Sequence, residues 1–245
     1  MRLAPSGCGH RSVSVVMGRM VAMSTGSSVD RDTIDPVEER RPRRPALLGK
    51  AAIESHGGAP DPAALADAAH TTAALLVQAG RDCDDAGARA RLVALVDAVG
   101  LGTVADLWAG RPARSLPGTL WRLYVLREWV RRDAVGAAHD FALGRGDVPV
   151  SHVVAGVAEP PTPEGLRLLL DAVLHGVFAG ELDVALERAG AFCRVVVAGR
   201  VHRADDVETN DPAGATALTR SSSSLLRTAE DLEAAAHLWR DGDLV

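Results

Sequence analysis

Apolar side chains recur every three or four positions along most of residues 60–200 and again near the C-terminus. This spacing places them on one face of an α-helix, whereas a half-buried strand would alternate apolar and polar residues. The stripe is clearest at Leu166, Leu169, Leu170, Val173, Leu174 and Val177. Composition agrees, because aromatic residues make up only 3% of the chain and strands are normally rich in them. We therefore predict an all-α fold, an irregular bundle of about seven or eight helices.

Capping residues and helix breakers divide this region into successive helices. Asp61 and Pro62 are suited to begin the first helix, and Thr162 and Pro163 are suited to begin a later one. Residues 148–158 are too short for periodicity to decide between a strand and buried helical turns. The expected helices cover about residues 62–80, 84–99, 103–110, 117–132, 134–143, 163–178, 182–198 and 222–240.

The segment 117–132 differs from the others because apolar residues occupy nearly every angle around its axis. It also contains Trp121 and Trp129, two of the four tryptophans. A helix that is apolar on all sides has to be surrounded by other elements. We predict that this segment is the central helix of the bundle.

Composition divides the chain into four parts. Residues 1–58 are charged and rich in Ser, Gly and Pro, so we expect a disordered arm. Its first ~20 residues are interpreted as an extension upstream of the true start codon. We expect one helical domain over 59–200 and a polar linker or surface loop over 201–220. A helix over 221–242 should pack on the main domain, because one amphipathic helix is not stable alone.

The positions of the cysteines and the hydropathy of the chain indicate the cellular compartment of the protein. Cys8, Cys83 and Cys193 are far apart and form no Cys-x-x-Cys motif, so neither a disulfide framework nor a thiolate zinc site is indicated. No apolar run approaches the ~20 residues needed to span a bilayer. We therefore expect a cytoplasmic protein without a membrane partner. Lys50 is the only lysine, which is typical of GC-rich bacterial coding sequences.

The sequence lacks the motifs that carry common enzyme chemistry. Neither a Gly-x-Ser-x-Gly elbow nor a phosphate-binding Gly-x4-Gly-Lys-Ser/Thr loop occurs. Asp67 with His70 and Asp171 with His175 have helical spacing, but they lie off the apolar stripes and are interpreted as surface ion pairs. We accordingly assign no catalytic residue, no metal site and no cofactor.

A histidine in the helix over 134–143 is a possible exception. His139 falls on the same face as Val135, Ala138 and Ala142. A histidine on an apolar face is usually a core residue with a hydrogen-bond partner, and the alternative is a buried base or ligand. The corresponding hypothesis is an apolar ligand pocket near His139, lined by Trp108, Trp121 and Arg127.

The segment 111–132 is strongly basic, with six arginines against one glutamate. A helix-turn-helix order is conceivable here, with phosphate contacts from Arg111, Arg114, Arg122 and Arg132. Against it, the helix that would read the bases is apolar on all sides and has no exposed polar row. The simpler interpretation is that Arg127 and Arg131 pair with acids from neighbouring helices.

Elimination favours a non-catalytic role. We expect a cytoplasmic helical protein that binds another protein, or a second copy of itself, in a regulatory or scaffolding function. One alternative is a nucleic-acid-associated regulator that uses the segment 111–132. The other is a small-ligand binder or enzyme with a pocket near His139.

Overall fold

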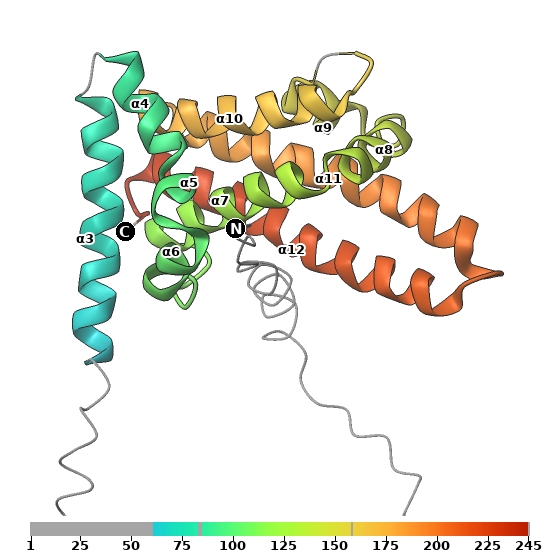
Figure 1. Cartoon of the computed structure of the whole chain (residues 1–245), viewed down its shortest axis with the longest axis horizontal. Helices are drawn as coiled ribbons and strands as arrows, with labels where there is room; N and C mark the ends of the chain where they lie inside the picture. The colour runs from blue at the N-terminus through green and yellow to red at the C-terminus, as the bar shows by residue number, and fades with distance from the viewer. Residues whose placement is uncertain (1–60, 83–84, 158, 245) are drawn as a thin grey trace, which may run out of the picture.

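The computed structural model describes residues 61–82, 85–157 and 159–244, and all regular secondary structure within these ranges is helical (Figure 1). The prediction of an all-α fold is confirmed, and the undecided segment 148–158 contains a helix. The expected disordered arm and start-site extension lie outside the described residues. The helices are α3 (Pro62–Arg81), α4 (Ala86–Val93), α5 (Leu95–Val99), α6 (Leu101–Trp108), α7 (Leu116–Arg132), α8 (Ala134–Gly144), α9 (Pro149–Ala155), α10 (Pro163–Ala179), α11 (Leu182–Glu208) and α12 (Pro212–Asp241).

Helix α7 is buried on nearly all sides, as its sequence predicts. Twelve of its 17 residues are buried, and it packs against α3, α6, α8, α10 and α12. Ser115 caps its N-terminus by accepting a hydrogen bond from the Gly118 amide. Tyr124 donates its hydroxyl to the Leu92 carbonyl, 2.7 Å away, which fixes α4 to the central helix.

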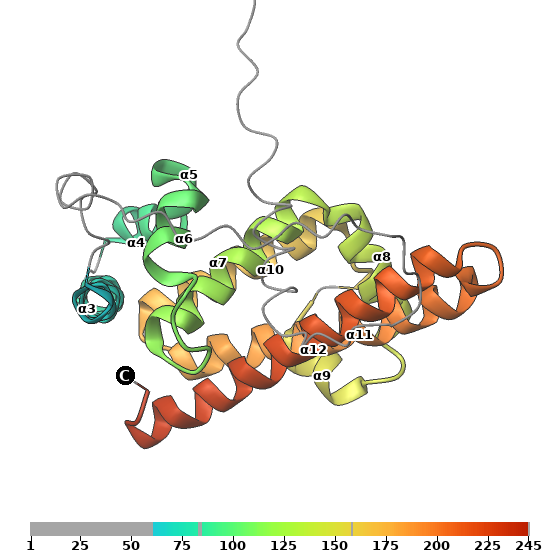
Figure 2. The ribbon, with the colours of Figure 1, turned by 90° about the horizontal axis from the view of Figure 1, so that it is seen from below.

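The predicted linker over 201–220 is wrong. Helix α11 continues to Glu208, and α12 begins at Pro212 after Asp211 caps it by accepting from the Gly214 amide. The two helices form a long antiparallel hairpin that projects from the end of the molecule opposite α3 (Figures 1 and 2). Small buried residues such as Ala204 and Ala215 fill the seam at its tip. The helix therefore persists where a stripe of large apolar residues is missing.

Helix α3 buries a different face from the one that its larger residues suggest. Ala69, Ala73, Val77 and Gly80 are buried, whereas Leu75 is 62% exposed. The small face lets α3 lie close to α10, because a Cβ at Gly80 would come within 2.7 Å of the Phe178 Cβ. Because this small face packs on α10, the adjacent face of α3 points toward the C-terminal end of α12.

The described part of the chain has no helix that combines the length and apolar character needed to cross a bilayer. The longest helices, α11 and α12, carry charged side chains along their length, many of them in ion pairs within the protein.

Candidate binding groove

His139 is exposed on α8, so its predicted place on a buried face is wrong. The buried face of α8 carries Ala137, Phe141 and Asp140 instead. Trp108 and Trp121 are both buried in the core, where the exposed His139 does not join them.

Arg127 is buried, and its charge is neutralised by neighbouring helices. Its Nε lies 2.5 Å from Asp171 of α10, and its Nη2 lies 3.3 Å from Asp97 of α5. Arg131 also binds Asp97, at 2.5 Å. The predicted pairing of Arg127 and Arg131 with acids from other helices is confirmed, whereas the predicted surface pair of Asp171 with His175 is replaced by the bond to Arg127.

This network shifts the pKa values of Arg127 and Asp97 toward their charged forms. Burial lowers the pKa of Arg127, but the hydrogen bonds to Asp171 and Asp97 outweigh it and leave the pKa raised. Burial likewise opposes ionisation of Asp97, yet hydrogen bonds from Arg131 and Arg127 hold its pKa below the ordinary value. The arginine is therefore a structural crosslink rather than an open ligand contact.

Three of the four arginines proposed for nucleic acid form ion pairs within the protein. Arg114 and Arg122 both contact Asp231 of α12, at 3.2 and 3.6 Å, and Arg132 contacts Glu128 at 2.6 Å. Arg111 is half-buried, and its Nε has no hydrogen-bond partner among the described residues. The four side chains do not form a free basic row.

A buried charged cluster that no sequence pattern predicted lies between α8 and α11. The Asp140 carboxylate accepts from Arg200, at 3.0 Å, and from Arg203, at 2.5 Å. The Arg200 guanidinium also lies 4.7 Å from the centre of the Trp129 ring. Every group in this cluster is satisfied from within the protein, so we assign it to stability.

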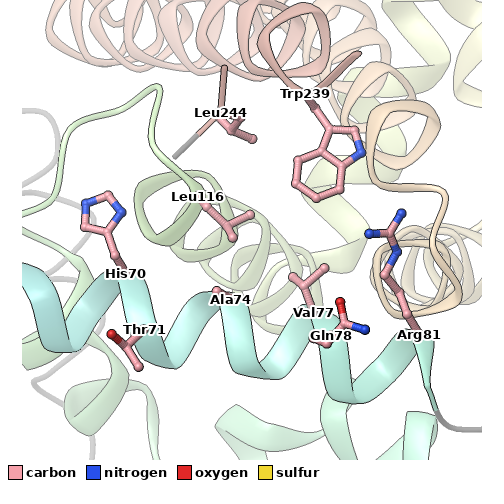
Figure 3. A pocket seen from close by; sticks show the side chains of 9 residues that line it. All are labelled: His70, Thr71, Ala74, Val77, Gln78, Arg81, Leu116, Trp239 and Leu244. Atoms are coloured by element: carbon pink, nitrogen blue, oxygen red, sulfur yellow. The ribbon is translucent and has the colours of Figure 1, made fainter. Parts of the chain in front are cut away.

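Among the described residues, the feature best suited to binding is a groove between α3 and the C-terminal end of α12 (Figure 3). Its volume is about 440 Å³, which lies within the range of known ligand pockets. Ala74, Gln78 and Arg81 on its α3 wall are exposed, so the groove opens to solvent. We call it the α3–α12 groove, and its lining is His70, Thr71, Ala74, Val77, Gln78, Arg81, Leu116, Trp239 and Leu244.

Local structure explains the α12 wall of the groove. Gly242 ends α12 with a φ of 81°, a backbone conformation that favours glycine. The chain then turns back, and the Asp243 and Leu244 amides both donate to the Leu238 carbonyl, at 2.8 and 3.2 Å. This turn buries Leu244 and sets it beside the half-buried Trp239.

The polar groups at the two ends of the groove differ. At one end, the Arg81 guanidinium lies over the Trp239 ring, 5.4 Å from its centre. Within the described ranges no carboxylate is paired with Arg81, and the lining includes no acidic residue. At the other end, the buried Nδ1 of His70 has no hydrogen-bond partner in that same part of the chain. The middle is apolar, formed by Val77, Leu116 and side chains of α12 and its tail.

The described residues contain no group of three or more His, Cys, Asp or Glu side chains able to hold a metal ion. Cys193 lies outside the groove and is fully buried, and burial raises the pKa of its thiol to about 12. No protein-family model, no curated protein and no solved structure matches this chain.

Proposed function

We propose that this protein is a non-catalytic binding protein that recognises a segment of a partner protein in the α3–α12 groove. The observation that carries the proposal is an open groove of about 440 Å³ whose apolar middle lies beside an arginine that no carboxylate of the described residues neutralises. Most other described arginines are bound to carboxylates. A cytoplasmic setting remains part of the proposal, based on the three scattered cysteines.

The shape of the groove favours a chain segment over a compact small molecule. His70 and Arg81 are 11 positions apart on α3, so the groove follows the helix for roughly 16 Å at about 1.5 Å per residue. One long side is open, which allows a peptide to enter without any movement of the helices. The other hypotheses lack comparable support, because Arg114, Arg122 and Arg132 are ion-paired and His139 is exposed.

A peptide display experiment tests this proposal. A random peptide library is selected on the full chain, and the enriched peptides are measured by fluorescence anisotropy. We expect the change Ala74→Trp to weaken their binding by about tenfold or more, since an indole at this exposed position fills the groove. The matched control is Ala79→Trp, which adds the same side chain to an exposed position of α3 outside the groove lining.

Circular dichroism and thermal unfolding of both variants verify that they fold as the original chain does. Enrichment of no peptide, or equal binding to the Ala74→Trp and Ala79→Trp variants, would overturn the proposed function.

A further inference from the structure

We infer that the α3–α12 groove takes an extended segment of about five residues, with apolar side chains at its centre and a carboxylate at the Arg81 end. This inference rests on the proposed function and specifies the chemistry of the partner.

The carboxylate is inferred from how Arg81 is held. A guanidinium is planar, and lying over the Trp239 ring occupies one of its faces. Its N–H groups point outward in the guanidinium plane, where they match the two oxygens of a carboxylate. The nearest acid in sequence, Asp82, accepts a hydrogen bond from the Gln78 amide at 2.8 Å instead. Trp239 therefore orients a cation whose binding edge has no acidic partner in the described structure.

The extended conformation is inferred from the opposite end. His70 lines the groove, and its half-buried imidazole has no hydrogen-bond partner among the described residues. The part of the ring that faces the groove can exchange a hydrogen bond with the backbone of a ligand, as donor or acceptor according to the tautomer. An extended peptide offers free backbone N–H groups, whereas a helix has already used most of them internally. His70 thus favours an extended segment over an amphipathic helix.

The length of the groove and the residues that line it agree with an extended segment whose carboxylate lies at the Arg81 end. An extended chain rises about 3.3 Å per residue, so about five residues cover the roughly 16 Å from His70 to Arg81. The central part of the segment would lie against Val77, Leu116 and Trp239, which are apolar (Figure 3). Leu244 closes this central part from the α12 side, so an apolar side chain is expected there.

Two matched libraries test the inference. Both display random pentapeptides between glycine spacers; one carries a glutamate fixed at either end, and the other a glutamine at the same positions. We expect the glutamate library to yield the tighter binders. Their affinity should fall about tenfold or more with Arg81→Gln, whereas glutamine peptides should be unaffected. The control change Arg91→Gln removes an arginine that is 75% exposed on α4, and it should leave both sets unchanged.

A charge reversal provides an independent readout. With Arg81→Glu, peptides that carry arginine in place of the fixed glutamate should bind better than the glutamate peptides. In the contrary outcome, the enriched peptides lose affinity with Ala74→Trp and yet bind equally well whether they carry the fixed glutamate or the fixed glutamine. If Arg81→Gln then also has no effect on their affinity, the inference is overturned and the proposed function stands. If neither library yields a binder, both fail.

Discussion

Replacing Asp140 with alanine is expected to destabilise the protein by about 3–5 kcal/mol, because it leaves two arginines without their shared carboxylate. Arg200 is the critical one, since its side chain is 9% exposed and its Nε lies 3.0 Å from Asp140. An unpaired buried guanidinium is far more costly than the loss of the pair itself. At about 2–4 °C per kcal/mol for a chain of this size, Tm should fall by roughly 6–20 °C.

Two comparisons separate this effect from a general sensitivity to charge loss. Glu164→Gln removes an exposed pair with Arg167 and should change stability by no more than about 1 kcal/mol. The double change Asp140→Leu with Arg200→Met removes both charges of the buried pair and should recover part of the loss. Urea unfolding of all three variants measures the differences. An Asp140→Ala variant as stable as Glu164→Gln would show that the cluster does not hold α8 to α11.

The helices could be predicted from the sequence because their ends are determined by neighbouring residues. Ser115 and Thr162 cap α7 and α10 through hydrogen bonds to amides three positions later, and Gly180 and Gly242 end α10 and α12 with positive φ. Such signals depend on a few adjacent residues. They are therefore visible before any tertiary contact is known.

The orientation of a helix rich in small residues was harder to predict. In α8, Val135, Ala138 and Ala142 suggest one buried face, but the large side chain of Phe141 selects another. The selected face buries Asp140 and exposes His139. No local feature could indicate this, because the partners of Asp140 lie 60 and 63 positions away on α11.

The groove could not be predicted for a similar reason. Its walls come from α3, the start of α7 and the end of α12, and Arg81 and Trp239 are separated by most of the described chain. The helix expected over 221–242 packs on the main domain, and its Trp239 is half-buried there. Its second contact, with Arg81, depends on the way the tail folds back after Gly242.

The crossing of α8 and α11 gives the other large expected effect. A Cβ on Gly199 would lie 1.7 Å from the Asp140 carbonyl oxygen, and one on Gly144 would lie 2.0 Å from the Val195 carbonyl oxygen. Both obstacles are backbone atoms, so no change of rotamer relieves the clash. The Gly199→Ala change must push the two helices apart, and we expect it to cost about 3 kcal/mol or more.

The matched control for Gly199→Ala is the same substitution at Gly102. That glycine is also helical, on α6, but no heavy atom lies within 4 Å of the position of its Cβ. There the substitution should be neutral or stabilise by about 0.4–1 kcal/mol, because alanine loses less backbone entropy on folding. If Gly199→Ala proves too unstable to purify, the same change at Gly144 tests the contact from the other helix. Urea unfolding that finds all three variants as stable as the original chain would contradict the close approach of α8 and α11.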